Sequence, residues 1–323
     1  MLIALSVTMS LVPTGSASAA EGHAAAVDET VAAVAPDVDV LEPVRGVDGR
    51  LAAAESVTSV PALGDGDLLV ANGALDQAAA QKALDVPDVV LSLPDEAQVA
   101  DSAAVVTESG TVVYAGEASV DVAVQATQSG VRVQTVIADS TAPTQYTYAF
   151  EGSTPVLNAD GSVDLVVAVD DNLTATVGHL DVPWAFDAAG APVATFYRVE
   201  GSSVVQVVDL SSVGSYPVVA DPNISSSCVW YGMCFIKFNR SYTNNIAAGT
   251  GIAGIVAGLT AVSGGILAPL AAVVGAKLGI DAIFAGWVLN RGNCMGYQFP
   301  VTNWLQPLTW GAYEVKRGQY NCA

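Results

Sequence analysis

The most constraining feature of this chain is a long apolar stretch, residues 246–289, built largely from glycine, alanine and branched aliphatic residues. Lys277 and Asp281 are its only charged residues. A helical segment that is apolar on every side must be buried, either inside protein or in a lipid bilayer. We expect the preceding residues to export, carry or restrain this stretch.

Turn residues divide the stretch into a predicted helical hairpin. The Ser-Gly-Gly tripeptide at 263–265 precedes Pro269, and a glycine pair followed by proline marks a turn before a new helix. The predicted helices cover residues 246–262 and 267–289. The second is long enough to cross a bilayer, which takes about 20 apolar residues, and the first is near the lower limit.

Small residues recur at every fourth position of both predicted helices, a spacing that lets two helix backbones approach closely. Each glycine costs about 1 kcal/mol in a water-exposed helix, so tight packing or lipid must offset it. Periodicity does not separate membrane helices from core helices of a disulfide-bonded domain, and both interpretations stay open. Lys277 can pair with Asp281 at i,i+4 in either case. The predicted helix-packing positions are Thr250, Gly254, Gly258, Ala271, Gly275 and Gly279.

The N-terminus has the pattern of a secretory signal. An apolar run through Val12 is followed by small residues that end at Ala19 and Ala20. An Ala-x-Ala pattern after an apolar run is typical of a signal-peptide cleavage site. A membrane anchor is the alternative, but the run is well short of a bilayer span. We expect residues 1–20 to be a signal peptide and the protein to be secreted, with association with a membrane or cell wall left open.

The four cysteines fit an exported protein. Cys228, Cys234, Cys294 and Cys322 all lie in the last part of the chain, and an even number in a secreted protein predicts disulfides. Three pairings exist; we favour Cys228 with Cys234 as a local loop and Cys294 with Cys322 as a clamp on the tail. Zinc is disfavoured because no Cys-x-x-Cys occurs and both histidines are distant in sequence.

Charge is divided unevenly along the chain. Residues 1–227 carry five basic and thirty acidic residues, a net of −25, whereas residues 228–323 carry six basic and two acidic residues, a net of +4. The acidic front and the cationic rear are able to attract one another within one chain. Nucleic-acid binding is not expected, because no cluster of lysine and arginine is present to neutralise phosphates.

The expected fold class is α+β: an antiparallel β-rich domain, a sandwich or a meander, followed by a small disulfide-bonded α-helical hairpin module. Residues 21–63 lack aromatic residues and are rich in Ala, Val, Asp, Glu and Pro, which predicts a disordered stalk or pro-segment. Residues 64–215 form the acidic β-rich domain. Short β-branched runs separated by turn residues predict its strands at 67–71, 89–93, 103–107, 111–115, 119–126, 131–137, 144–150, 163–169, 194–199 and 204–210, with a helix at 74–84.

Two further segments are assigned to loops. Residues 216–227 begin Tyr-Pro-Val-Val-Ala-Asp-Pro, and proline on both sides of an extended run predicts a semi-rigid linker to the module at 228–323. The alternative is a processing site after Asp221-Pro222. The loop around Trp184 holds Asp181 and Asp187, a pair that a glycosidase would use as acid and base but that more often belongs to a turn.

Residues 131–222 carry the motifs Thr-Ala-Pro-Thr-Gln-Tyr, Pro-Trp-Ala-x-Asp-Ala-x-Gly and Tyr-Pro-Val-Val-Ala-Asp-Pro. With these motifs the segment resembles a β module of largely uncharacterised secreted actinobacterial proteins. The segments Phe-Asn-Arg-Ser-Tyr-Thr at 238–243 and Asn-Arg-Gly-Asn-Cys at 290–294 resemble the Gly/Ala-rich, Cys-containing helical tails of such proteins. The resemblance covers about the last 190 residues; it implies this architecture and export, and it assigns no catalytic residue.

No motif for catalysis or cofactor binding stands out. The sequence has no Gly-x-Gly-x-x-Gly, Walker-type, His-Glu-x-x-His or Gly-x-Ser-x-Gly pattern. Asp170, Asp171 and Asn172 supply oxygens for a weak calcium loop, but such clusters are common in turns without metal. His179 is expected at the surface or in a turn. The protein is therefore predicted to be no enzyme and to use no cofactor or metal.

The leading expectation is a secreted protein whose glycine-zipper hairpin is membrane-active, in the manner of a bacteriocin, with the acidic β domain as carrier or mask. The alternative is a secreted cell-envelope binding or structural protein in which the hairpin is a protein core. A secreted hydrolase using Asp181 and Asp187 is a third possibility. The tail after residue 294 is rich in Tyr and Trp, which suits a membrane interface, a carbohydrate contact or a small core.

Overall fold

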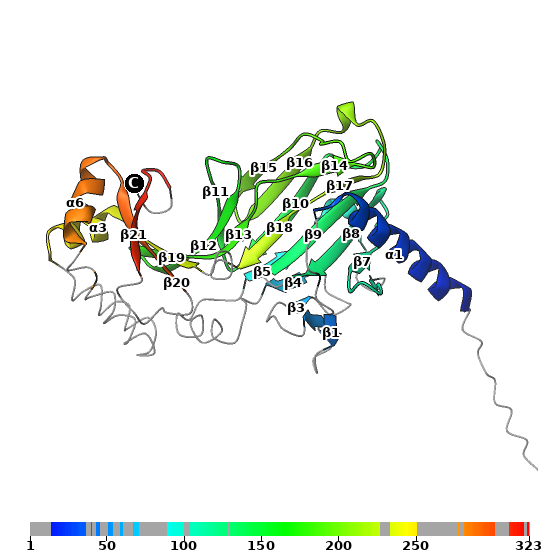
Figure 1. Ribbon diagram of the computed structural model, residues 1–323, viewed down its shortest axis with the longest axis horizontal. Coiled ribbons are helices and arrows are strands. Elements are labelled where there is room, and N and C mark those ends of the chain that lie inside the picture. Colours follow the sequence, from blue (N-terminus) through cyan, green and yellow to red (C-terminus); the bar gives the residue numbers. More distant parts are fainter. Residues whose placement is uncertain are drawn as a thin grey trace, which may run out of the picture.

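The computed structural model describes residues 14–36, 40, 43–45, 51–53, 59–60, 67–70, 89–99, 104–127, 130–226, 233–250, 277, 281–300, 310–319 and 322. Strands dominate these residues, and every strand pairing between the named strands is antiparallel (Figure 1). The predicted antiparallel β-rich fold is confirmed. The predicted helix at 74–84 lies outside the described residues.

Two small sheets come from the N-terminal half and the β15–β16 hairpin. A three-stranded sheet is formed by β1 (Pro43–Arg45), β2 (Leu51–Ala53) and β3 (Ser59–Val60). A five-stranded sheet has the order β15 (Thr195–Glu200), β16 (Ser203–Val208), β10 (Gln145–Glu151), β5 (Val89–Ser92), β4 (Asp67–Val70).

The third sheet is the largest, and it runs from one end of the molecule to the other (Figure 1). Its main path is β21 (Gly311–Val315), β20 (Cys294–Pro300), β19 (Met233–Phe238), β13 (Leu173–Leu180), β18 (Asn223–Ser226), β9 (Gly130–Ile137), β8 (Val120–Ala126), β7 (Val112–Tyr114), β6 (Val105–Val106). Four strands join it beside this path: β11 (Thr154–Leu157), β12 (Val163–Asp170), β14 (Ala185–Asp187) and β17 (Val218–Ala220).

The main core lies between the five-stranded sheet and the large sheet. On β10 the period-2 alternation of a strand turns Tyr146, Tyr148 and Phe150 inward, and all three are fully buried. They belong to the same apolar cluster as residues of β8, β9 and β12. The hydroxyl of Tyr148 also shares a hydrogen bond of 2.7 Å with Thr135 Oγ1 of β9. This bond satisfies a buried hydroxyl and joins the two sheets.

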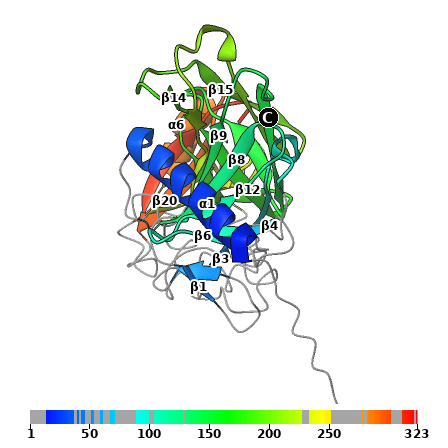
Figure 2. The same ribbon diagram turned by 90° about the vertical axis from the view of Figure 1, so that its right-hand side faces the viewer.

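The outer face of the large sheet is covered by α1 (Thr14–Val34), which lies across the strands (Figure 2). Its residues Ala24, Val27 and Val31 follow helical spacing and are buried, where they pack on apolar residues of β7, β8, β9 and β17. The prediction of a disordered stalk over residues 21–63 is therefore wrong for the helical part. The composition of this segment does not indicate that the outer face of the large sheet is apolar and that a helix must cover it.

Polar contacts also hold α1 in place. Asp28 accepts hydrogen bonds from Ser109 Oγ (2.8 Å) and Thr111 Oγ1 (2.7 Å) in the β6–β7 turn. His23 Nε2 lies 3.1 Å from Asp121 Oδ2 on β8. The α1 residues that make these polar contacts, His23 and Asp28, both follow the predicted cleavage site at Ala19 and Ala20.

The predicted linker at 216–227 is instead part of the large sheet. β17 pairs with β9 and β14, β18 pairs with β9 and β13, and Val218, Val219, Ala220 and Asp221 are fully buried. An uninterrupted apolar run is what a strand buried on both faces looks like in sequence. The prolines do not break the sheet, because the carbonyl of Pro222 still accepts from Val133 N (2.8 Å).

The region 228–323 is likewise not separate from the β domain. β19 pairs with β13, and β20 and β21 follow it, so these three strands continue the large sheet. Among the described residues of this region, two helices accompany them: α3 (Arg240–Ala247) and α6 (Ala282–Asn290). The predicted first helix of the hairpin, 246–262, is wrong at its start, because α3 ends at Ala247 and Gly249 takes a left-handed φ of +64°. The predicted turn at 263–265 lies outside the described residues.

Candidate functional site

The C-terminal end of the molecule is built on the packing of α3 against α6, at the opposite end from α1 (Figure 1). Ile246 of α3 and Ala285 and Val288 of α6 are fully buried in the main core cluster. The predicted pairing of Lys277 with Asp281 is confirmed, with Nζ 3.4 Å from Oδ2. Tyr297 of β20 donates a hydrogen bond of 3.0 Å to the same carboxylate, which fixes the start of α6 to the sheet.

Asn239 caps α3 and joins it to the β domain. Its Oδ1 accepts from Tyr242 N (2.9 Å), as an N-cap side chain does. Its Nδ2 donates to Asn172 Oδ1 (2.8 Å) in the β12–β13 turn. The calcium-loop interpretation would use Asn172 Oδ1 as a metal ligand, but in the structure this oxygen accepts the hydrogen bond from Asn239.

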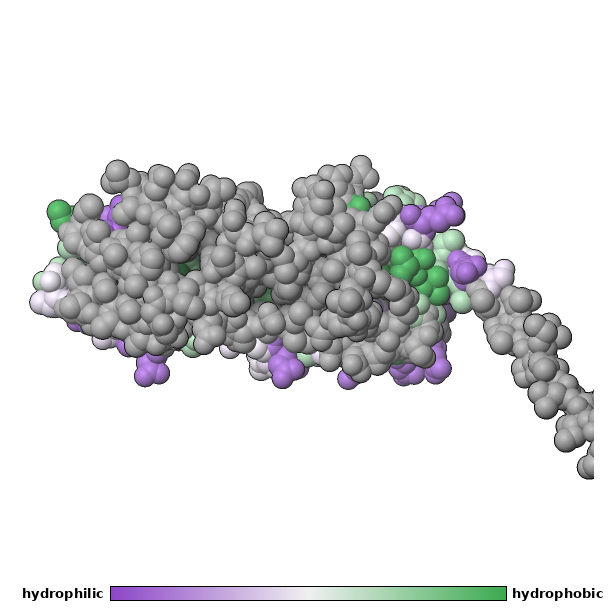
Figure 3. All heavy atoms as spheres, turned by 90° about the horizontal axis from the view of Figure 1, so that it is seen from below, coloured by the Kyte–Doolittle hydropathy of each residue, from purple (hydrophilic) through white to green (hydrophobic). Residues whose placement is uncertain are grey.

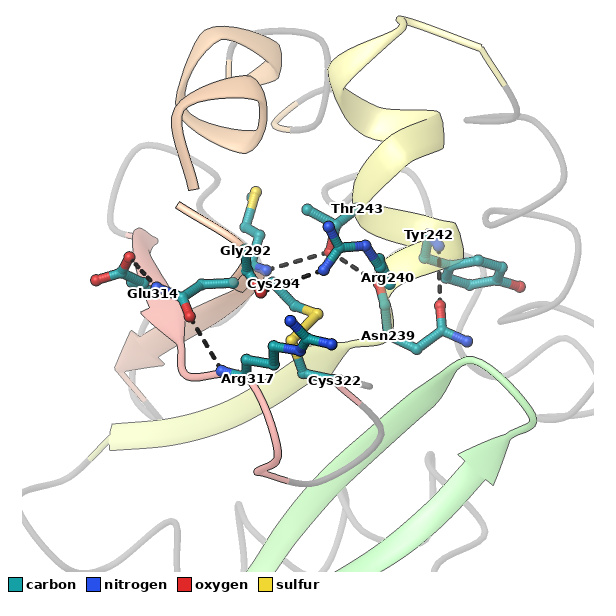
Figure 4. The surroundings of a disulfide bond; sticks show 11 residues. Asn239, Arg240, Tyr242, Thr243, Gly292, Cys294, Glu314, Arg317 and Cys322 are labelled. Atoms are coloured by element: carbon teal, nitrogen blue, oxygen red, sulfur yellow. Dashed lines mark hydrogen bonds between the residues drawn. A yellow bond between two sulfur atoms is a disulfide. The ribbon is translucent and has the colours of Figure 1, made fainter. Parts of the chain in front are cut away.

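The Cys294–Cys322 disulfide lies beneath these helices, as Figure 4 shows. Around it, Thr243 Oγ1 donates to Asn239 O (2.8 Å) and accepts from Met295 N (3.2 Å), while Arg240 Nη1 donates to Gly292 O (3.2 Å). Helix α3 is thus hydrogen-bonded to the start of β20, next to the disulfide.

Glu314 on β21 is the acidic centre of the same region. Its carboxylate accepts from Asn293 Nδ2, pairs with Arg291 (3.0 Å) and pairs with Lys316 (2.8 Å). The hydrogen bonds from Lys316 and Asn293 lower the pKa of Glu314 to about 2. This carboxylate therefore stays ionised at any physiological pH.

One face of α6 points outward and combines apolar and cationic residues. Ile283 is 88% exposed and Trp287 is 49% exposed, one helical turn apart. The guanidinium of Arg291, a further turn along, lies 4.7 Å from the centre of the Trp287 ring. The ring of Phe284 also stacks on the ring of Trp287, with a distance of 5.7 Å between the ring centroids. We call Ile283, Trp287 and Arg291 the α6 outer face. In the space-filling view, apolar surface protrudes at this end of the molecule (Figure 3).

Among the described residues, no helix has the length and apolar character needed to cross a membrane.

The predicted disulfide between Cys294 and Cys322 is confirmed, with a sulfur–sulfur distance of 2.07 Å. Cys228 lies outside the described residues, and for Cys234 the structure describes only the backbone, in β19 opposite Phe299. The pairing of Cys228 with Cys234 therefore stays a prediction.

The predicted helix-packing row is mostly outside the described residues: Gly254, Gly258, Ala271, Gly275 and Gly279. The one described member, Thr250, is exposed and follows the end of α3. Its N–H donates to Asn245 O (2.9 Å), so it belongs to the turn that ends the helix. The predicted processing residues Ala19 and Ala20 lie in the first part of α1 and are exposed.

The loop carboxylates Asp181 and Asp187 serve structural contacts. Asp187 Oδ1 accepts from Ala189 N and Ala191 N, both at 2.9 Å, which closes the turn after β14. These backbone bonds hold the pKa of Asp187 below its ordinary value, so this carboxylate is a poor general acid. Asp181 accepts from Asn223 Nδ2 of β18 (2.5 Å).

A buried polar cluster joins the C-terminal strands to the β domain. His179 Nδ1 lies 2.7 Å from Asp164 Oδ1, and Lys237 Nζ lies 3.1 Å from Asp164 Oδ2 and 2.6 Å from Thr176 Oγ1. The expectation that His179 lies at the surface is wrong, because it is only 7% exposed. Burial lowers the pKa of Lys237 to about 8, against the opposing effect of Asp164.

Sequence reasoning missed both the α6 outer face and this cluster. The i, i+4, i+8 spacing of Ile283, Trp287 and Arg291 places them on one face of a helix, but it does not indicate that this face points outward. No sequence signal brings Asp164, His179 and Lys237 together, because the contact depends on β19 pairing with β13. The chain matches no protein-family model, no curated protein and no solved structure.

Proposed function

We propose that this is a secreted, non-enzymatic protein whose C-terminal helical end engages a lipid membrane, with the acidic β domain as its carrier. The observation that carries the proposal is the α6 outer face. Trp and Ile side chains with a neighbouring cation are the combination that settles at a bilayer interface, where the ring lies at headgroup depth. The signal-like N-terminus supports secretion.

Charge supports a preference for anionic lipid at this end. Residues 228–323 have a net charge of +4, and Arg291 stands directly beside Trp287. A basic residue near an anionic bilayer surface contributes about 1 kcal/mol to binding. The glycine-rich stretch at 246–289 ends within α6, and its earlier residues would supply further apolar surface to the bilayer.

The β domain fits a carrier better than a detachable mask. β19 pairs with β13, and Lys237 pairs with Asp164, so the C-terminal end and the acidic domain share one sheet and one buried ion pair. We infer that both parts reach the membrane together and that the acidic surface limits binding to the α6 end.

The test is co-sedimentation of the oxidised protein with vesicles of phosphatidylglycerol and phosphatidylcholine in equal parts. The double variant Ile283→Ser/Trp287→Ser removes two exposed side chains, so its fold is expected to be intact. It should bind vesicles at least about tenfold more weakly, since each lost side chain forfeits on the order of 1.5 kcal/mol or more of apolar transfer. Phe196→Ser is the matched control, because Phe196 is 55% exposed on β15 of the β domain.

Equal binding by the double variant and by the control would refute the role of α6. If the wild-type protein does not sediment with vesicles at all, the membrane proposal fails. The cell-envelope structural protein, in which the glycine-rich stretch is a protein core, would then be the better account.

A further inference from the structure

A cavity of about 270 Å³ lies over the buried polar cluster, between the β12–β13 strands and β19 and β21. Its lining includes none of the three residues of the α6 outer face, although Arg291 pairs with the lining residue Glu314. Its polar wall includes Asp160, Asp164 and Lys237, and its other wall includes Phe235 and Tyr313. Lys237 is only 5% exposed and forms the inner part of the polar wall, whereas Asp160 is exposed and lies at the rim.

Two of the three carboxylates of this cavity are paired with cations. Asp164 pairs with Lys237, and Glu314 pairs with Arg291 and Lys316. Asp160, at the exposed rim, accepts from the backbone N–H and the hydroxyl of Ser162, at 3.1 and 2.7 Å, in the β11–β12 turn. A cationic ligand would therefore find an unpaired carboxylate at the rim only, and an anionic ligand would meet three carboxylates. The cavity therefore suits a neutral molecule that donates hydrogen bonds to carboxylate lone pairs.

The aromatic wall has an unused polar group. Phe235 and Tyr313 meet edge to face with ring centroids 5.9 Å apart. The hydroxyl oxygen of Tyr313 is buried and has no hydrogen-bond partner. A buried hydroxyl without a partner costs about 1–3 kcal/mol, a cost that a ligand hydroxyl would remove.

Gly296 of β20 makes room for this arrangement. A Cβ at Gly296 would stand 2.6 Å from Tyr313 Cζ and 2.8 Å from Ile236 O. Glycine therefore allows the ring of Tyr313, which lines the cavity, to lie directly against β20. The pairing of β20 with β21 brings the two residues together, because Gly296 is the register partner of Tyr313.

We propose that this cavity binds one neutral sugar ring. Sugar hydroxyls both donate and accept, which matches carboxylates and an ammonium on one side and a phenol hydroxyl on the other. The C–H face of a pyranose packs on an aromatic wall, as apolar ligand surface does in protein pockets. At about 270 Å³ the cavity is slightly smaller than the usual lower limit of about 300 Å³ for ligand pockets, so it admits no more than a single ring.

The test is saturation-transfer NMR on the oxidised protein with glucose, galactose, mannose, arabinose and N-acetylglucosamine, and with glucosamine and glucuronate as charged counterparts. At least one neutral sugar should bind, with glucosamine and glucuronate at least about tenfold weaker. Tyr313→Phe removes only an unpartnered hydroxyl, so it should keep the stability of the protein and weaken sugar binding about tenfold. Tyr216→Phe, which removes another buried hydroxyl without a partner, is the matched control and should bind normally.

Gly296→Ala provides a second, independent variant. It should displace the Tyr313 ring and lose sugar binding while the Cys294–Cys322 disulfide still forms. Binding of no neutral sugar would overturn the proposal, as would a Tyr313→Phe variant that binds as tightly as the wild-type protein. Tight binding of glucosamine or glucuronate in preference to every neutral sugar would overturn it as well. A vesicle-binding result does not bear on this cavity, so the two proposals fail separately.

Discussion

Lys237 Nζ lies 3.1 Å from Asp164 Oδ2, and this buried ion pair links β19 of the C-terminal region to β12 of the β domain. The lysine comes from the cationic part of the sequence and the aspartate from the acidic part. Together with the pairing of β13 and β19, the contact makes the two parts one folded unit.

Removing one partner of this pair should be costly. Lys237→Ala removes the lysine partner of Asp164 in a buried site and leaves only the contact with His179, and breaking a buried pair in this way typically destabilises a protein by about 3–5 kcal/mol. The exposed pair of Arg198 with Glu200, at 2.6 Å, is the matched control, and Arg198→Ala should cost at most about 1 kcal/mol. Urea unfolding measures the free energy of unfolding of both variants. An equal decrease in the two variants would show that burial of the Lys237–Asp164 pair does not increase its contribution to stability.

Asp221 should give the protein a recognisable pH dependence. Burial raises the pKa of Asp221 to about 7, despite hydrogen bonds from Trp184 N, Tyr197 and Gln206. A carboxyl whose folded pKa lies above its unfolded pKa stabilises most at low pH, and this contribution is lost as the pH rises through 7. The stability of the wild-type protein relative to Asp221→Asn should therefore fall between pH 4 and pH 8.

The control for this experiment is Asp209→Asn. Asp209 is exposed, and hydrogen bonds from the side chain and the backbone N–H of Ser211 (3.0 Å for the N–H) lower its pKa, so its contribution should change only below about pH 4. The difference in unfolding free energy between the wild-type protein and Asp221→Asn should decrease from pH 4 to pH 8. A difference that stays constant or increases over this range would contradict a buried Asp221 with a raised pKa.

The Cys294–Cys322 disulfide should stabilise the C-terminal strands. It joins residues 28 apart in sequence, and closing a loop of that length is worth about 3–4 kcal/mol in the chain-entropy description. Cys294→Ala/Cys322→Ala should lower the free energy of unfolding by about that amount under oxidising conditions. If the double variant unfolds at the same urea concentration as the wild-type protein, the disulfide does not stabilise the protein by restraining its unfolded chain.

Helix α1 should behave as part of the fold. Val31 is fully buried against the large sheet, and Val31→Ala removes two methyl groups at a cost of about 2 kcal/mol. Ala33 lies on the exposed side of the same helix, and Ala33→Ser should stay within about 0.5 kcal/mol of the wild-type protein. Thermal unfolding of the two variants distinguishes a docked helix, with unequal effects, from a solvated one, with equal effects.

Much of the β domain was readable from the sequence. Turn signals such as Ser109-Gly110 and Gly201-Ser202 mark hairpins that the structure confirms, because these residues set both the turn and the register of the adjoining strands. The strands from 216 onward were not recognised. Their burial depends on partners distant in the chain, and a valine run between prolines looks the same in a linker and in a buried strand.

The candidate site was less accessible to sequence reasoning. Cysteine counting found the Cys294–Cys322 clamp, and helical spacing found the Lys277–Asp281 pair. The outward direction of Ile283 and Trp287 depends on which side of α6 packs on α3, and the burial of His179 and Lys237 depends on strand pairing. Both are tertiary facts, which local pattern does not encode.

The central claim is that the α6 end enters a bilayer interface. The most direct measurement is quenching of Trp287 fluorescence by lipids brominated near the top of the acyl chain, taken as the difference between the wild-type protein and Trp287→Phe on anionic vesicles. We predict a blue-shifted emission that the brominated lipids quench and that the variant lacks. An emission from Trp287 that stays red-shifted and unquenched in the presence of vesicles would contradict the account.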